Sequence, residues 1–298
     1  MTRQRIPGWF KTPIPQRLVS LAGYTVLILT GAIFIFLLLQ SWPFFRDTAD
    51  LTFLTGDRWL PVSFPPTYQI RSFLVSSAYI AGMAILLGCP LGIVSAITMS
   101  ELLPKSVGLI VRSVFEFTAG IPSVVFGFLG LRLVAPFVAR VFNLPTGLTG
   151  FTAGLVLSVM ILPTLVSLAE EALNAVPREY AEASYALGAT RWQTIWRVIV
   201  PAGKSGILAA VLLATGRAIG ETMTVLMVGG GRLSTPGSIF DPMRTVTALI
   251  ASEVNNAARY SPQYHALFAA GLVLFTITFA INALAAKVIV KRVRGDKK

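Results

Sequence analysis

The sequence predicts an all-α integral membrane protein with six transmembrane helices. Of its 298 residues, 54% are hydrophobic and only 13% are charged, and the mean hydropathy of +0.72 lies outside the range of ordinary soluble domains. A hydrocarbon core of ~30 Å needs roughly 20 apolar residues per helix. Six runs of about this length occur, at residues 18–39, 73–99, 113–131, 148–169, 206–230 and 266–286.

The first run is expected to stay in the protein as a membrane helix. Arg3, Arg5, Lys11 and Arg17 precede it, and no small-residue cleavage site follows it. It is also too long, and too far from the start of the chain, for a secretory signal peptide.

The other runs differ in charge. The runs at 73–99, 148–169 and 266–286 contain no Asp, Glu, Lys or Arg, whereas the third holds Glu116 and the fifth holds an Arg–Glu pair. The single cysteine, Cys89, lies in the second run and is expected to pack as a small apolar side chain.

Membrane topology, rather than nucleic-acid binding, explains the net charge of +12. With the N-terminus inside, 16 of the 25 Lys and Arg residues lie on the cytoplasmic side, 8 lie outside, and Arg217 lies in the membrane. This bias follows the positive-inside rule. It predicts a cytoplasmic N-terminal segment (1–17), one membrane domain (18–290) and a basic cytoplasmic tail (291–298).

Two longer segments are expected on the outer side. Residues 40–72 are rich in Trp, Phe, Tyr and Pro, which suit the aqueous interface of a membrane. Residues 231–265 contain the only histidine, His265, which is expected to be solvated or to cap a helix rather than to bind a ligand.

The longest cytoplasmic connection, residues 170–205, is expected to form short amphipathic helices outside the bilayer with a turn near Gly188. Its apolar side chains alternate with charged ones. Such a surface either covers its own protein or docks another.

A motif in this connection favours docking. Glu182-Ala183-Ser184 is followed after three residues by Gly188 and after nine more by Val198-Ile199-Val200-Pro201. This pattern resembles the EAA loop of permease subunits in bacterial ABC importers, with mild departures at Ser184, Val198 and Val200. Small side chains let a helix seat closely in a partner, and glycine permits the tight turn. The resemblance implies a coupling helix for an ATPase subunit.

The sequence predicts no catalytic and no metal site in this chain. Gly203-Lys204-Ser205 is not the end of a phosphate-binding loop, because that motif requires glycine at position 198, where Val stands. No Cys/His cluster has metal spacing and no nucleophile has a base. ATP and Mg²⁺ are therefore expected in separate subunits. The alternative of an intramembrane enzyme would use Glu116 or Glu221, but no His or Asp accompanies either in the spans.

The stretch "GRAIGETM" at 216–223 places Arg217 and Glu221 four residues apart in an otherwise uncharged run. A continuous helix from Gly206 would put them roughly 17 and 23 Å into the membrane, on one helical face. Such groups face a bundle interior or a water-filled path. Gly216 and Gly220 have the spacing that lets a neighbouring helix approach closely. A structural ion pair that fixes helix register is the alternative to a substrate path.

The third run repeats this pattern nearer the cytoplasm, where Glu116 follows Arg112 by four residues. Pro122 can break the helix, and the broken helix, with Thr118 and Ser123 close by, could offer donors to an anion. Equally, Pro122 and Gly127 could serve only close packing, and Glu116 could form a structural pair.

Taken together, "GRAIGETM", "FEFTAGIPSVVFGFLGL" at 115–131, the EAA loop and "SWP" at 41–43 resemble the permease of phosphate-specific (Pst) ABC importers, PstC type. The resemblance runs from about residue 20 to 290 and is weakest at 65–72, which includes Arg71. It implies the type I importer fold in a bacterial inner membrane. The implied partners are a second permease of PstA type, two ABC ATPase subunits and a periplasmic phosphate-binding protein.

The charged pair suits phosphate, which carries negative charge and still holds a proton near neutral pH. Arg217 would offer a guanidinium fork and Glu221 an acceptor, whereas fully ionised sulfate would be repelled by Glu221. The resemblance implies alternating access driven through Glu182–Gly188, with residues 42–69 and 231–262 meeting the binding protein. The same fold importing sulfate or molybdate, and a phosphate-sensing scaffold, are the alternatives.

Overall fold

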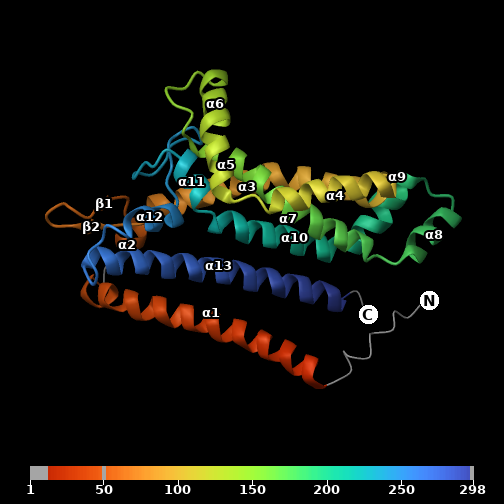
Figure 1. The fold of residues 1–298 in the computed structure, drawn as a ribbon, viewed down its shortest axis with the longest axis horizontal. Coiled ribbons are helices and arrows are strands. Elements are labelled where there is room, and N and C mark those ends of the chain that lie inside the picture. The colour runs from red at the N-terminus through yellow and green to blue at the C-terminus, as the bar shows by residue number, and fades with distance from the viewer. Residues whose placement is uncertain (1–12, 49–51, 296–298) are drawn as a thin grey trace.

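The computed structural model describes residues 13–48 and 52–295 and consists of long helices with one short hairpin (Figure 1). Among these residues, six helices are long and apolar enough to cross a membrane. They cover residues Leu18–Asp47, Arg71–Leu102, Ser123–Val141, Gly150–Asn174, Arg191–Gly220 and Pro262–Ala283. The predicted segments 1–17 and 291–298 lie partly outside the described residues.

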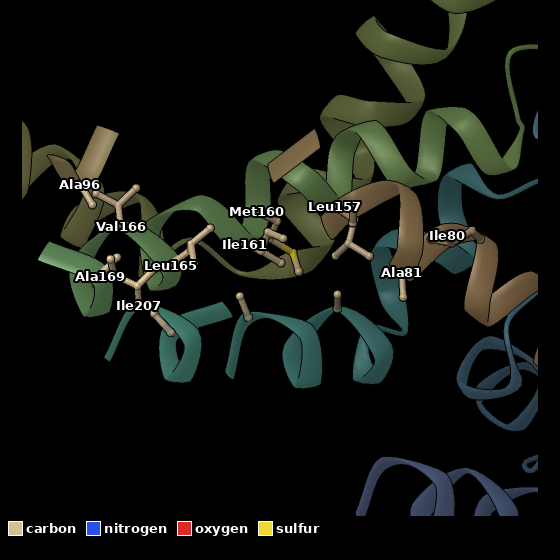
Figure 2. Packing of buried hydrophobic residues seen from close by; sticks show 14 of the residues in the cluster. Ile80, Ala81, Ala96, Leu157, Met160, Ile161, Leu165, Val166, Ala169 and Ile207 are labelled. Atoms are coloured by element: carbon tan, nitrogen blue, oxygen red, sulfur yellow. The ribbon is translucent and has the colours of Figure 1, made fainter. Parts of the chain in front are cut away.

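Helix α7 (Gly150–Asn174) is the centre of the packed helices. Helix α3 (Arg71–Ile97), continued by a π-helical turn (Thr98–Leu102), packs along it. Figure 2 shows the shared core, where side chains of α3, α7 and α10 (Val200–Gly220) meet. Its labelled members are Ile80, Ala81, Ala96, Leu157, Met160, Ile161, Leu165, Val166, Ala169 and Ile207.

Two glycines on α3 allow this close packing. A Cβ at Gly92 would lie 2.4 Å from Leu165 Cδ2, and a Cβ at Gly88 would lie 2.9 Å from Ile161 Cδ1. Both leucine and isoleucine are fully buried, so larger residues on α3 would push the helices apart.

A second pair of helices lies beside this centre. Helix α1 (Pro13–Thr48) runs along α13 (Pro262–Gly295), and α13 also contacts α10 (Figure 1). The apolar segment of α1 is not buried within the chain. The start of α1 and the end of α13 lie at the same end of the molecule as α8 (Arg178–Ala186).

The opposite end carries the segments predicted to lie outside. Helix α2 (Thr52–Thr55) leads to a hairpin of β1 (Trp59–Leu60) and β2 (Thr67–Tyr68), which pair antiparallel with Trp59 opposite Tyr68. Figure 1 shows the hairpin projecting beyond the ends of α1 and α13.

The hairpin is held firmly at its base. Trp59 is buried and its Nε1–H donates to Glu253 Oε2 at 2.7 Å, which ties the hairpin to α12 (Val246–Glu253). Arg71, in the segment where the family resemblance is weakest, begins α3 and forms an ion pair with Asp57 at 2.9 Å.

Two predicted spans differ from the structure because their helices are broken. The run at 113–131 divides into α4 (Lys105–Ala119) and α5 (Ser123–Leu129), and the helix then continues through a π-helical turn (Gly130–Val134) into α6 (Ala135–Val141). The run at 206–230 divides into α10 and α11 (Met223–Val228). Hydropathy does not register these breaks, since the residues at them are mostly apolar or small.

Candidate functional site

The break in the fifth span separates the two ions of "GRAIGETM". Arg217 lies in the last turn of α10, whereas Glu221 follows the end of that helix with an extended backbone, φ −68° and ψ 130°. The continuous helix that the prediction assumed ends at Gly220, and Glu221 is its C-cap residue. That the two side chains share one helical face stays a prediction, because the extended ψ of Glu221 redirects only the chain that follows it.

Each ion has a different partner. The Arg217 Nη1–H donates to Thr164 Oγ1 on α7 at 2.6 Å. The Glu221 carboxylate accepts from the backbone N–H of Thr224 at 3.0 Å, which caps the first turn of α11. The arginine is thus fixed to the central helix, and the glutamate is fixed to the segment beyond the break.

The break in the third span lies at Gly120–Pro122. Ile121 donates its N–H to the Thr118 carbonyl at 3.2 Å, and Pro122 then has an extended ψ of 140° before α5 begins at Ser123. The Thr118 hydroxyl donates to the Val114 carbonyl of its own helix. Pro122 therefore stands where the sequence predicts an interrupted helix.

The two breaks meet in space. Thr224 Oγ1–H donates to the Ser123 carbonyl at 3.0 Å, and the Thr224 side chain is fully buried. Glu221 and Ser123, which are 98 positions apart in the sequence, thereby contact the same residue. The structure brings these two predicted pathway residues together.

Glu116 lies elsewhere, in an ion cluster on α4. Arg112 Nε is 3.0 Å from Glu116 Oε1, and Arg112 Nη2 is 3.4 Å from Glu171 Oε1 on α7. The hydrogen bond to Glu116 raises the pKa of Arg112. This arrangement favours the structural reading of Glu116, because its partner also joins α4 to α7.

A groove of about 930 Å³ runs beside Arg217, between α10, α13 and α1. Its walls are mostly apolar, and Arg217, Thr278 and Asn282 provide its polar side chains. Gly216 and Gly220 also line it. No atom lies within 4 Å of a Cβ built at Gly220, and the nearest to Gly216 is Asn282 at 3.9 Å. The described residues therefore do not pack closely on Gly216 or Gly220, and close packing of a helix from another subunit there stays a prediction.

Gly127 does pack closely. A Cβ there would lie 2.8 Å from Met227 Sδ and 3.2 Å from Thr224 Cα on α11. Gly130 is similar, since its Cβ would lie 2.9 Å from Val156 Cγ2 and 3.0 Å from Val228 Cγ1. The outer part of the third span is thus seated against α11.

The predicted coupling segment lies at the opposite end from the hairpin. Glu182 and Ala183 are exposed on α8, while Ser184 Oγ is 2.9 Å from Thr194 Oγ1 on α9 (Arg191–Thr194). Gly188 has φ +81°, which favours glycine. The turn predicted at this residue is therefore present.

The segment presents an apolar surface. Leu187 is 90% exposed, and the half-exposed rings of Trp192 and Trp196 continue this surface along α9 and the next turn. A capping box, in which Thr190 and Gln193 exchange hydrogen bonds, fixes the start of α9. The fixed and uncovered surface suits docking.

Sequence reasoning missed Thr164 and Thr224. A threonine in an apolar helix carries little signal of a distant partner, and both hydroxyls bond across helices. One signal was readable for Thr224, because it stands three residues after a glutamate, the spacing of a side-chain cap. In the part of the chain that the structure describes, no group of three His, Cys, Asp or Glu side chains could hold a metal ion.

Comparison with known proteins adds a family and relatives. The family described as binding-protein-dependent transport system inner membrane component matches residues 88–295. A probable ABC transporter permease protein of Bacillus subtilis, YqgH, is 37% identical over 266 residues, which cover 89% of this chain and 86% of the relative. The phosphate transport system permease proteins PstC of Mesorhizobium japonicum and Haemophilus influenzae are 36% and 32% identical, covering 89% and 95% of this chain and 85% and 94% of theirs.

Solved structures share the fold. A bacterial alginate ABC transporter in complex with a pentasaccharide-bound periplasmic protein matches with a TM-score of 0.62 and 17% identity, over 91% of this chain and 94% of that one. The MetNI methionine ABC transporter in an inward-facing conformation matches with a TM-score of 0.56 and 18% identity, over 74% and 94%. At these identities the likeness concerns the fold.

Proposed function

Since this chain belongs to the family of binding-protein-dependent transport system inner membrane components, we propose that it is a permease subunit of an ATP-driven phosphate importer in a bacterial inner membrane. The observation that supports phosphate as the transported solute is the similarity to PstC proteins at 31–36% identity over most of the chain. The six apolar helices and the fold shared with ABC importers support the role of a permease.

The helix breaks beside Arg217 support a passage for an anion at this place. Broken helices at membrane depth are tolerated where backbone is buried in protein or lines a water-filled cavity. The guanidinium, oriented by Thr164, offers paired N–H donors that match phosphate oxygens. Arg217 is therefore the proposed contact of the transported phosphate.

Glu221 has a revised part in this proposal. Its carboxylate caps α11 and stands beside Ser123 rather than neutralising Arg217. A negative charge at this place repels a fully ionised anion, whereas phosphate that still holds a proton can donate a hydrogen bond to it. Glu221 thus favours phosphate over sulfate or molybdate.

The exposed surface around Glu182, Leu187 and Trp192 is the proposed seat of an ATPase subunit. The resemblance to an EAA loop and the exposure of most α8 side chains among the described residues support it. ATP and Mg²⁺ are then used by the ATPase subunits. This places α8 in the cytoplasm together with the start of α1 and the end of α13, in agreement with the basic cytoplasmic side.

Two further partners complete the proposed complex. A periplasmic phosphate-binding protein meets the hairpin and the segment 231–262, because the hairpin projects beyond the membrane helices on the side opposite α8. A second permease subunit covers the groove beside Arg217 and the exposed side of α1.

Labelled phosphate and sulfate uptake into vesicles that hold the reconstituted complex tests the proposal. We expect ATP-dependent phosphate uptake that requires the binding protein and that Arg217→Ala reduces strongly. Equal uptake of sulfate would assign the chain to another oxyanion importer, and normal phosphate uptake by Arg217→Ala would contradict the site.

A further inference from the structure

The outer parts of the two broken spans are fastened to each other. The buried Thr224 hydroxyl donates to the Ser123 carbonyl, and the Thr224 backbone N–H is held by the Glu221 carboxylate. One residue therefore joins the first turn of α5 to the first turn of α11, immediately after both breaks.

Close packing continues this junction outward. Gly127 and Gly130 on the third span bring α11 within contact, against Met227 and Val228 respectively. A Cβ at Gly127 would meet the flexible Met227 side chain, and one at Gly130 would meet Val228 on α11 and Val156 on α7. Helix α5 and the π-helical turn after it therefore fit closely against α11. Thr247 Oγ1 on α12 also donates to the Glu221 carbonyl at 2.9 Å, which steadies the break itself.

The inner parts of the same spans do not stay together. Helices α4 and α10 each pack on α7, and Figure 1 shows them running on either side of it toward the α8 end. The third and fifth spans thus converge in their outer halves and diverge in their inner halves. The points of divergence are Gly120–Pro122 and Glu221–Thr222, where both α-helices are interrupted and the backbone turns to an extended conformation at Pro122 and Glu221.

We infer that α5 and α11 are one outer unit, fastened by Thr224, that turns as a single body against α4 and α10 during transport. Thr224 is then a positioning residue that keeps Ser123 and Glu221 together while the inner halves move. The inference rests on the proposed transport function. In the third and fifth spans, the outer helices α5 and α11 then move together, whereas the inner helices α4 and α10 move relative to them.

A cross-link within the outer unit tests this division. A Cβ at Gly127 would lie 3.4 Å from Met227 Cβ, close to the separation that a disulfide requires. Met227→Cys removes the sulfur atom that a Cβ at Gly127 would meet at 2.8 Å, so Gly127→Cys fits beside it. In a Cys89→Ala background, this pair is expected to keep phosphate uptake when oxidised, because the two residues do not separate. Loss of uptake on oxidation that dithiothreitol restores would overturn the inference.

The hydroxyl itself is tested by Thr224→Val, which keeps the shape of the side chain. We expect at least about tenfold lower uptake at similar complex yield, recovery in Thr224→Ser, and recovery in the oxidised cross-linked Thr224→Val protein. Failure of the cross-link to restore uptake would contradict a fastening role. Thr215→Val is the matched control, since that hydroxyl donates to the Val211 carbonyl of its own helix.

ATP hydrolysis is measured on the same samples because it does not depend on which anion is carried. If the unmodified complex takes up no phosphate, the proposed function is wrong. The fastening of α5 to α11 is then tested by whether the oxidised cross-linked protein keeps ATP hydrolysis that the binding protein stimulates. Normal uptake by the unmodified complex, with loss only in the oxidised cross-linked protein, overturns the fastening alone.

Discussion

Thr164 on α7 accepts a hydrogen bond of 2.6 Å from the Arg217 guanidinium on α10, although the two residues lie 53 positions apart. The bond turns a flexible arginine into an oriented donor beside a break in its own span. It also links the central helix to the proposed path of the anion.

Replacing Arg217 tests this site most directly. Because charge-assisted hydrogen bonds contribute about 1.5–3 kcal/mol, Arg217→Ala is expected to lower phosphate uptake by roughly 10- to 100-fold. Arg217→Lys should recover only part, since lysine lacks the planar fork. Initial rates of labelled phosphate uptake measure both, with the exposed Arg140→Ala as the charge-matched control. Unchanged uptake in Arg217→Ala at equal complex yield would refute the contact.

Thr164→Val should act through Arg217. Without the acceptor, the guanidinium loses its fixed direction but keeps its charge, so we expect a smaller loss of several-fold, mainly as a raised KM for phosphate. In Arg217→Ala the same threonine change should have little further effect. Uptake kinetics of the two single variants and the double variant measure this coupling, and independent, additive losses would argue against it.

Glu221 should affect selectivity more than it affects stability. Glu221→Gln retains an oxygen that can cap α11 but removes the negative charge. We therefore expect that sulfate inhibits phosphate uptake more strongly in this variant than in the unmodified complex. Glu221→Ala also removes the cap, at about 1 kcal/mol, and should lower the thermal stability of the complex. Equal sulfate inhibition of Glu221→Gln and the unmodified protein would exclude a selective role.

Variants at the α8 end should affect binding of the ATPase subunit but not binding of the binding protein. Glu182→Lys and Leu187→Ser are expected to reduce co-purification of the ATPase subunit at least about tenfold while leaving binding-protein affinity unchanged. Arg140→Glu, an exposed charge reversal outside both proposed partner surfaces, is the control for Glu182→Lys. If the ATPase subunit still co-purifies fully and transport is normal, α8 is not the coupling helix.

Variants in the hairpin should weaken binding of the binding protein but not binding of the ATPase subunit. Phe64 and Val62 are 101% and 95% exposed, so Phe64→Ser and Val62→Ser remove no internal contacts and should leave the fold intact. Burial of these side chains in a complex would contribute about 1.5–3 kcal/mol each. Titration of the detergent-solubilised complex with the binding protein should show roughly tenfold weaker binding, with full ATPase co-purification. Unaltered affinity in both variants would place the contact elsewhere.

The contact of α3 with α7 predicts a stability effect. Gly92→Ala places a methyl group against the buried Leu165 and should destabilise the protein by about 1–3 kcal/mol. Gly82→Ala is its control, because no atom lies within 4 Å of a Cβ there. Thermal unfolding in detergent compares them, and equal midpoints would show that α3 and α7 can move apart without cost.

Much of this architecture could be predicted from residue patterns. Length and hydropathy locate the spans that begin at Arg71, Gly150 and Pro262 to within about five residues at each end, and they locate the start of the span at Leu18, because a bilayer demands long apolar helices. The turn at Gly188 was predictable because its conformation is one that glycine adopts readily.

The breaks at Gly120–Pro122 and Glu221–Thr222 were harder to predict. An apolar run stays apolar whether or not its helix is continuous, so hydropathy placed the third span about ten residues too early. The spacing of Arg217 and Glu221 also allowed an ion pair between them. Their real partners, Thr164 and Thr224, lie on another helix or beyond the break, and only tertiary structure brings them close.

Helix α1 carries a consequence for the cell's supply of subunits. Among the described residues, α13 is the main neighbour of its apolar segment, and the rest of that segment is exposed. In a copy without the proposed second permease subunit, that exposed flank faces lipid, which apolar side chains tolerate. The yield of folded subunit in the membrane should therefore depend little on whether the second permease is made with it.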